Sequence, residues 1–208
     1  MTRDEFAAFV TDVTAGERHV SRETLSRIDV YAETLRAWQP RINLVSNRSL
    51  EDVWRRHFLD SAQMVKWITP EMRALDLGSG AGFPGLVVSI ITGAPVVLAE
   101  SDSRKCAFLR EVRRLTDANA EIAEARIEDL DAGSFDVVVA RALAPLSALL
   151  DHAAGRTRSD GFCLFLKGAR VEDELTDARE NWNIQVEQHP SLTDPDGVVL
   201  KIRNLSRV

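Results

Sequence analysis

The fold of this chain is decided by residues 74–85, which read ALDLGSGAGFPG. The first four residues are mostly apolar and predict a buried strand, the glycines predict a tight turn, and Pro84 predicts the opening of a helix. Gly78, Gly80 and Gly82 can adopt positive φ angles and let a ligand approach bare backbone. A strand that enters a helix through such a turn indicates a nucleotide-like ligand at the mouth of an α/β sheet.

The glycine pattern distinguishes two classes of ligand. Starting at Asp76, it has the form D-x-G-x-G-x-G, which is closer to the turn that holds S-adenosylmethionine than to the G-x-G-x-x-G turn of dinucleotide enzymes. Glu100 ends the next predicted strand, about 20 residues further on, where an acidic side chain accepts hydrogen bonds from ribose hydroxyls; a solvated strand end is the alternative. Phe83 either lies beside the ligand or caps the helix against the core.

Strand and helix patterns alternate after Arg73, which is typical of a doubly wound, mostly parallel sheet with helices on both faces. The connection 189–197 is too short for a parallel crossover, so we expect the last two strands to pair antiparallel. The predicted strands are 74–77, 96–100, 120–125, 135–140, 162–166, 183–187 and 198–202. The predicted helices are 84–91, 103–116, 146–154 and 172–180, with a short acidic segment at 127–130.

The first part of the chain carries a helical pattern instead. Ser21 is the predicted cap of a helix whose apolar residues recur at helical spacing until Pro40 ends it. Ser49, with an acidic residue three positions on, predicts a second helix start after an intervening loop. We therefore expect an N-terminal helical extension over residues 1–70 and an α/β domain over 71–208.

Composition narrows the class of protein. The chain has 208 residues, 45% of them hydrophobic and 28% charged, which fits one substantial domain with a small extension. Its net charge of −6 argues against a protein that coats nucleic acid non-specifically, yet it allows one local basic face. We expect no membrane span and no secretory signal, because no long apolar run is present. Cys106 and Cys163 lie in apolar segments and predict a cytoplasmic location without disulfides.

Further strand ends supply candidate ligand-binding residues, because ligands of open α/β sheets bind outside the carboxyl ends of the strands. Ile127 and Glu128 follow the third predicted strand, where an adenine needs an apolar surface and an acceptor for its amino group; an acidic loop is the alternative. Arg141 ends the fourth strand and could hold the ligand or orient a base or phosphate; an ordinary surface charge is the alternative. Lys167 ends the fifth strand and is predicted to face the same crevice.

A basic rim is predicted beside this crevice. Arginines and a lysine recur in the helix 103–116 and in the N-terminal part, and together they could contact an RNA backbone. A solvated charged face is the alternative. The side chains concerned are those of Arg41, Arg48, Arg55, Arg56, Arg104, Lys105, Arg110, Arg113 and Arg114.

Other chemistries are disfavoured by spacing. The four histidines, His19, His57, His152 and His189, have no cysteine or carboxylate at metal-ligand spacing, so we expect no metal site. His57 is predicted instead to pair with Asp60 on a helix face. Neither cysteine follows a proline, which disfavours covalent catalysis of the kind used by cytosine-C5 methyltransferases. The G-x-S-x-G elbow, the P-loop and the N-P-P-Y loop of exocyclic-amine methyltransferases are all missing.

Five blocks of sequence, in order, resemble one family. They are Asn43-Leu44, RHFLDS at 56–61, DLGSGAGFPG at 76–85, Arg141-Ala142 and LKG at 166–168. The chain is similar to RsmG, also called GidB, the family of bacterial 16S ribosomal RNA guanine-N7 methyltransferases. The resemblance covers roughly residues 35 to 170 and, by strand order, most of the remainder, whereas the tail before about residue 20 gives no usable match.

The resemblance implies a Rossmann-like class I methyltransferase that uses S-adenosylmethionine, releases S-adenosylhomocysteine and acts on the small ribosomal subunit. It implies an RNA-facing extension and, we expect, a monomer without metal. The donor-contacting residues would be Gly78, Gly80, Phe83, Glu100, Ile127, Glu128 and Arg141, and the RNA-contacting ones Arg56, His57, Lys105 and Lys167. Two positions depart from the family: Glu100 replaces the usual Asp, which keeps ribose recognition with a longer arm, and Ala140 replaces a frequent Ser, so no hydroxyl contact is assigned there.

Guanine N7 suits a site without an obvious catalytic base. It is an exposed lone pair, unprotonated at neutral pH, so catalysis can come from in-line positioning, worth up to roughly 7–11 kcal/mol. The target would be an unpaired or splayed-out nucleotide. Three alternatives remain: methylation of a protein or small molecule by the same fold, a non-catalytic ribosome-assembly module, and a nicotinamide oxidoreductase, which the glycine spacing disfavours.

Overall fold

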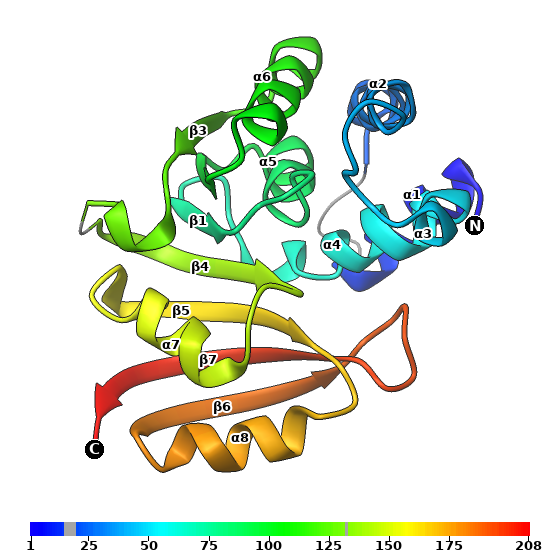
Figure 1. The fold of residues 1–208 in the computed structure, drawn as a ribbon. Helices are drawn as coiled ribbons and strands as arrows, with labels where there is room; N and C mark the ends of the chain where they lie inside the picture. Colours follow the sequence, from blue (N-terminus) through cyan, green and yellow to red (C-terminus); the bar gives the residue numbers. More distant parts are fainter. Residues whose placement is uncertain (15–19, 132) are drawn as a thin grey trace.

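The protein is built around a seven-stranded sheet, seen in a computed structural model that describes residues 1–14, 20–131 and 133–208. The strands are β1 (Ala74–Leu77), β2 (Val96–Glu100), β3 (Ala120–Glu124), β4 (Phe135–Arg141), β5 (Thr157–Lys167), β6 (Trp182–Pro190) and β7 (Val198–Arg207). Their order is β3-β2-β1-β4-β5-β7-β6 (Figure 1). Strands from β3 to β5 pair in parallel, and β7 pairs antiparallel with both β5 and β6, which confirms the predicted mostly parallel sheet.

Helices cover both faces of the sheet. The α-helices are α1 (Arg3–Val13), α2 (Arg22–Trp38), α3 (Asn47–Glu51), α4 (Asp60–Ala62), α5 (Gly85–Thr92), α6 (Ser103–Thr116), α7 (Leu146–Ala153) and α8 (Val171–Arg179). A π-helix spans Trp54–Leu59, and 3₁₀-helices span Val65–Trp67 and Ile127–Asp129. Within the described ranges, no helix is both long and apolar enough to cross a membrane.

The central strands send alternate side chains to opposite faces, as the pleat of a strand requires. Ala74 and Val137 pack into a core cluster with α5, α6 and the N-terminal helices. Their neighbours Leu75 and Val138 pack into a second cluster with α7 and α8. All four side chains are fully buried, and this two-sided burial is why β1 and β4 are almost continuously apolar.

The structure extends several predicted strands. β5 begins at Thr157 instead of 162, β6 reaches Pro190 and β7 reaches Arg207. Most of the added residues are exposed or half-buried, so they lack the apolar run that marks a covered strand. β3 stops at Glu124, one residue short of its predicted end.

The second helix start differs from the prediction. Ser21 caps α2 as predicted, its Oγ accepting a hydrogen bond from the Thr24 backbone N–H at 3.0 Å. The predicted start at Ser49 is wrong, because Ser46 is the cap and its Oγ accepts a hydrogen bond from the Ser49 backbone N–H at 3.2 Å. α3 ends at Glu51 and the chain continues into the π-helix, whose wider turns a 3.6-residue pattern does not reveal.

The N-terminal helices share a hydrophobic core with the sheet domain. Tyr31 of α2 stacks on Phe83, which follows the glycine turn, with ring centroids 5.1 Å apart. Phe58 of the π-helix meets both rings edge-on. The domain boundary predicted at residue 70 therefore crosses a continuous core and stays a prediction. Part of the predicted extension, residues 15–19 with His19, lies outside the described residues.

Candidate active site

A cavity of about 510 Å³ opens at the carboxyl ends of β1, β2, β3 and β4. We call it the glycine-turn pocket. The structure brings most of the sequence-predicted residues into its lining, although they come from five separate segments. Those residues are Gly78, Gly80, Phe83, Glu100, Lys105, Ile127, Glu128 and Arg141.

The three glycines of the turn have different roles. All three have positive φ, at +63° for Gly78, +56° for Gly80 and +89° for Gly82. A Cβ on Gly80 would find no heavy atom nearer than the Gly78 carbonyl oxygen at 3.9 Å, so this position opens onto the pocket. A Cβ on Gly82 would come within 2.6 Å of the Tyr31 hydroxyl and of Leu86. Gly82 therefore allows helix packing behind the turn, whereas Gly80 allows ligand approach in front of it.

Asp76 supports the turn from below. Its side chain is fully buried, and its Oδ2 accepts a hydrogen bond from the Gly85 backbone N–H, the first residue of α5, at 2.8 Å. Burial raises the pKa of this carboxyl to about 7, against the opposing effect of the Gly85 hydrogen bond. Asp76 is not part of the pocket lining, so the first residue of the D-x-G-x-G-x-G pattern shapes the turn.

Glu100 joins the turn to α6. One carboxylate oxygen accepts a hydrogen bond from the Gly80 N–H at 2.9 Å, and the other accepts one from the Asp102 N–H at 2.8 Å. Asp102 in turn caps α6. A carboxylate offers about four acceptor positions, so two bonds to the protein leave capacity for a ligand hydroxyl. The side chain is only 8% exposed but lines the pocket.

Phe83 packs against the core, which is one of its two predicted roles, and it also borders the pocket. Its ring is 4% exposed, stacks on Tyr31 and lies 4.8 Å from the His57 ring, so most of it is core. One part of the residue still borders the glycine-turn pocket. Tyr31 also donates a hydrogen bond from its hydroxyl to the backbone carbonyl of Ala81 in the turn.

The predicted adenine-binding segment forms the far wall. Ile127 and Glu128 lie in the 3₁₀-helix after β3, both in the pocket lining. Arg156 holds this segment by donating to the Ile127 carbonyl at 2.8 Å, and His152 Nε2 lies 3.6 Å from the Glu128 carboxylate. An apolar side chain and an acceptor therefore meet here, as the prediction requires.

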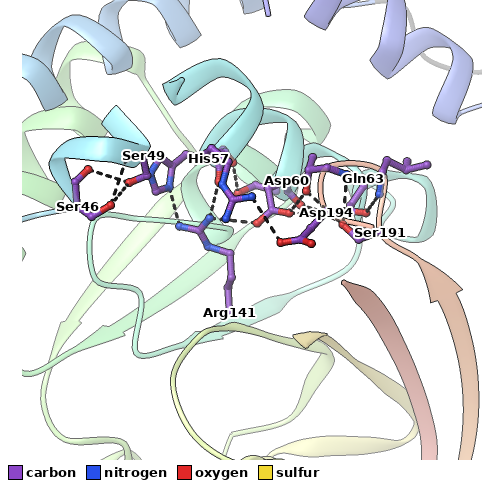
Figure 2. A network of polar contacts seen from close by, with 12 residues as sticks. Ser46, Ser49, His57, Asp60, Gln63, Arg141, Ser191 and Asp194 are labelled. Carbon is purple, nitrogen blue, oxygen red and sulfur yellow. Dashed lines mark hydrogen bonds and ion pairs between the residues drawn. The ribbon is translucent and has the colours of Figure 1, made fainter. Parts of the chain in front are cut away.

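Arg141 is the centre of a polar network, shown in Figure 2. Its Nη1 donates to the Arg56 carbonyl at 2.9 Å and to Asp60 Oδ2 at 3.1 Å, and its Nη2 donates to His57 Nδ1 at 2.8 Å. The guanidinium also lies 5.3 Å from the centre of the Phe83 ring. Arg141 was predicted to face the crevice, with an ordinary surface charge as the alternative. It does line the glycine-turn pocket, but its guanidinium also fastens the π-helix to β4, with 18% of the side chain exposed.

His57 and Asp60 do not pair with each other as the spacing suggested. His57 is 6% exposed, and burial together with the charges of Arg141 and Arg56 lowers its pKa to about 3. The ring is therefore neutral at physiological pH and accepts from Arg141. Asp60 accepts from Arg141 and, through Oδ1, from the Thr193 hydroxyl at 2.5 Å. The length of the connection between β6 and β7 predicted how those strands pair, but nothing in the sequence indicated that its Thr193 contacts Asp60.

The four side chains predicted to contact RNA fall into two groups. Arg56 is half exposed, and Lys105 lines the glycine-turn pocket. His57 is buried, and Lys167 is 9% exposed, with its Nζ 2.5 Å from the Glu174 carboxylate. In this structure His57 and Lys167 both contact protein groups, because the elements that pack over the strand ends supply partners that the sequence pattern did not reveal. Their contact with RNA stays a prediction.

Much of the predicted basic rim on α6 is paired. Ion pairs link Arg104 to Asp102, Arg110 to Glu124 and Arg114 to Glu111. The described residues contain no cluster of three or more histidine, cysteine or acidic side chains suited to a metal ion. Tyr31 was missed by the sequence analysis, although it is the only tyrosine of the chain.

Comparison with known proteins identifies the family. The family model described as GidB, rRNA small subunit methyltransferase G, matches residues 24–199. The ribosomal RNA small subunit methyltransferase G of Paramagnetospirillum magneticum is 53% identical over 189 residues, which covers 90% of this chain and 92% of that protein. That of Rhodospirillum rubrum is 46% identical over 208 residues and covers both chains completely.

Solved structures agree at the level of the fold. A TehB-like SAM-dependent methyltransferase from Corynebacterium glutamicum has a TM-score of 0.60 at 16% identity, over 83% of this chain and 98% of that one. TYW2 from M. jannaschii, solved in complex with AdoMet, has a TM-score of 0.56 at 14% identity, over 79% of this chain and 78% of that one. The fold is thus that of the Rossmann-like methyltransferases, and the chain belongs to the rRNA small subunit methyltransferase G family.

Proposed function

We propose that this protein transfers the methyl group of S-adenosylmethionine to N7 of a guanine in 16S ribosomal RNA. As a member of its family it is an S-adenosylmethionine-dependent methyltransferase of small-subunit ribosomal RNA. The observation that carries the proposal is the glycine-turn pocket, where the open position at Gly80 and the carboxylate of Glu100 lie together. This cradle, which a Cβ would fill, fits a nucleoside-like methyl donor.

Different residues of the pocket lining would contact the ribose, the adenine and the amino-acid end of the donor. Glu100 would accept hydrogen bonds from the ribose hydroxyls with its remaining acceptor positions. Ile127 and Glu128 would receive the adenine, and the backbone at Gly78 and Gly80 would receive the amino-acid end. We assign Arg141 a positioning role, because its side chain lines the pocket while it is fastened to the π-helix.

Methyl transfer to guanine N7 depends on the alignment of donor and acceptor and requires no proton transfer. The donor supplies an electrophilic methyl on a sulfonium; as the N7 lone pair forms the new N–C bond, the S–C bond breaks and the positive charge passes to the guanine. No proton has to leave N7, so a general base is unnecessary. His57, the nearest titratable ring to Arg141, is neutral, buried and engaged through Nδ1, which supports a structural role for it. In-line placement of the two reactants supplies the rate enhancement.

The proposal also covers the substrate, the RNA-contacting residues, the cellular location and the oligomeric state. The substrate is 16S ribosomal RNA in the small subunit, and residues 1–70 form an RNA-facing extension whose contacts include Arg56, with Lys105 at the pocket. The protein acts as a cytoplasmic monomer. The half-exposed guanidinium of Arg56 supports the RNA contact.

The test is methyl transfer from labelled S-adenosylmethionine to small subunits and to their extracted RNA, both from cells that lack this gene. Digestion to nucleosides identifies the product. Label in 7-methylguanosine is the expected result, and the better acceptor shows whether ribosomal protein is needed. Donor binding without any label in RNA would refute the proposal in favour of a protein substrate or a non-catalytic scaffold.

A further inference from the structure

Three neighbouring hollows share lining residues, two of them at the carboxyl ends of the strands and the third beside them on the N-terminal segment. The first is the glycine-turn pocket. A second hollow, of about 220 Å³, shares Arg141 and Ala142 with it. A third, of about 450 Å³, shares Arg56 with the second and is otherwise lined by residues of α3 and its surroundings. We call the third the arginine hollow, because Arg48, Arg55 and Arg56 line it.

The second hollow has the size of a single nucleobase. Its volume equals that of about seven liquid water molecules, which is enough for one bicyclic base. Its walls come from the ends of β4 and β5, from the π-helix and from the β6–β7 connection. This connection is held against the N-terminal segment by the Arg55 guanidinium, which donates to the Thr193 carbonyl at 2.9 Å, and by Leu192, whose N–H donates to Gln63 at 3.2 Å.

Most charged groups around the second hollow are already satisfied. Asp60 accepts from Arg141 and Thr193, and Lys167 lies against Glu174. Asp194 differs, because its side chain is 42% exposed and its Oδ2 is 3.5 Å from Arg56. Its Oδ1 accepts from the Asp196 N–H at 3.1 Å, which leaves acceptor positions on both oxygens.

We propose that the second hollow receives the target guanine and that Asp194 reads its Watson–Crick edge, while the arginine hollow holds an adjacent RNA phosphate; this inference rests on the proposed function. Guanine N7 and O6 share one edge of the base, and that edge must face the glycine-turn pocket across Arg141. The N1–H and N2–H₂ donors then point away from the donor, toward acceptors on the far wall. A carboxylate accepts from both donors, whereas adenine offers an acceptor at N1 and is rejected.

The arginine hollow complements a phosphate. Its three guanidinium groups outnumber its one acid, Asp52, and guanidinium forks bind phosphate oxygens in pairs. Arg56 lies at the boundary between the two hollows, so a nucleotide whose base enters the second hollow would carry its phosphate past this side chain. The target nucleotide must be splayed out of its stack to reach this position.

The test compares two substitutions in one loop. Asp194→Asn keeps the size of the side chain but turns one acceptor into a donor, and Asp196→Asn makes the same change two residues away, outside the hollow's lining. With small subunits as substrate, Asp194→Asn should lower kcat/KM by roughly 5- to 150-fold, the range of a bidentate base contact, with unchanged affinity for S-adenosylhomocysteine. Asp196→Asn should match the wild type.

Base discrimination supplies a readout that a purely structural role would not change. With S-adenosylmethionine saturating, so that adenosine monophosphate does not compete for the donor's adenine position, guanosine monophosphate should inhibit the wild type at lower concentration than adenosine monophosphate, and Asp194→Asn should remove that difference. Arg48→Gln should weaken binding of subunits and reduce the slope of log affinity against log salt by roughly 0.7–0.9. Arg158→Gln, at the opposite edge of the sheet, is the control of equal charge change.

The outcomes separate this inference from the proposed function. If the wild type places no label in 7-methylguanosine, the proposed function fails. If the wild type methylates guanine but Asp194→Asn is as active as Asp196→Asn, or if the two nucleotides inhibit equally or not at all, the assignment of the second hollow is overturned.

Discussion

Two substitutions in the glycine turn should separate ligand affinity from stability, because one should mainly weaken donor binding and the other should mainly lower the free energy of unfolding. In Gly80→Val, the added side chain meets no protein atom nearer than 3.9 Å from its Cβ, so the structural cost is limited to the backbone at φ +56°. That cost is about 1–2 kcal/mol of the free energy of unfolding. The isopropyl group projects into the space that the donor must occupy, and donor affinity should fall at least about tenfold, or about 1.4 kcal/mol.

Gly82→Ala should mainly lower the free energy of unfolding. Here the added Cβ would lie 2.6 Å from the Tyr31 hydroxyl and from Leu86, and 3.0 Å from Leu109. Overpacking of this kind costs about 1–3 kcal/mol, in addition to about 1–2 kcal/mol for the backbone at positive φ. The free energy of unfolding should therefore fall by about 2–5 kcal/mol, more than in Gly80→Val.

Urea denaturation measures the free energy of unfolding, and isothermal titration calorimetry with S-adenosylhomocysteine measures ligand affinity. The reasoning is refuted if folded Gly80→Val binds the ligand as tightly as the wild type, because the turn is then not the donor site. It is equally refuted if Gly82→Ala is as stable as Gly80→Val, because the packing behind the turn would then not limit side-chain size.

Three further predictions concern the groups around the turn. The pKa of Asp76 is about 7 in the folded protein, so the folded state binds one more proton than the unfolded state between pH 4 and 7, and the contribution of Asp76 to the free energy of unfolding should fall by about 1.4 kcal/mol per pH unit over that range. Because His57 gives the opposite slope from about pH 3 to 6.5, the quantity to measure is the free energy of unfolding of the wild type minus that of Asp76→Asn. This difference should fall with pH, and a difference that does not change with pH would show that Asp76 is not the source. Arg141→Ala should lower the free energy of unfolding by about 2–3 kcal/mol, because it leaves buried partners unpaired, and should reduce turnover; an equally stable variant in thermal and urea unfolding would show that the network contributes little. Tyr31→Phe loses the hydrogen bond to the Ala81 carbonyl and should cost about 1 kcal/mol in urea unfolding while weakening donor binding, and unchanged donor affinity would show that the turn holds its shape without it.

The sequence predicted the framework of the fold because its signals are local. Residues 74–85 carry strand, turn and helix in one continuous stretch, and each subsequent strand of the parallel sheet is an apolar run of its own. The antiparallel pairing of β6 and β7 followed from the length of one connection. Since the carboxyl ends of parallel strands meet at one edge, Glu100, Ile127 and Arg141 could be placed in one pocket before any coordinates were known.

Tertiary structure alone decided how these side chains are used. The partners of Arg141 come from the π-helix and from Asp60 of α4, more than 80 positions earlier in the chain, and Thr193 reaches Asp60 across 133 positions. No periodicity connects such residues, because burial and pairing depend on which elements pack over a strand end. The sequence by itself therefore determined the sheet and the glycine turn, whose causes lie in neighbouring residues; packing determined that His57 and Lys167 are occupied by protein contacts, that Asp76 supports the turn from below, and that a base-sized hollow adjoins the glycine-turn pocket.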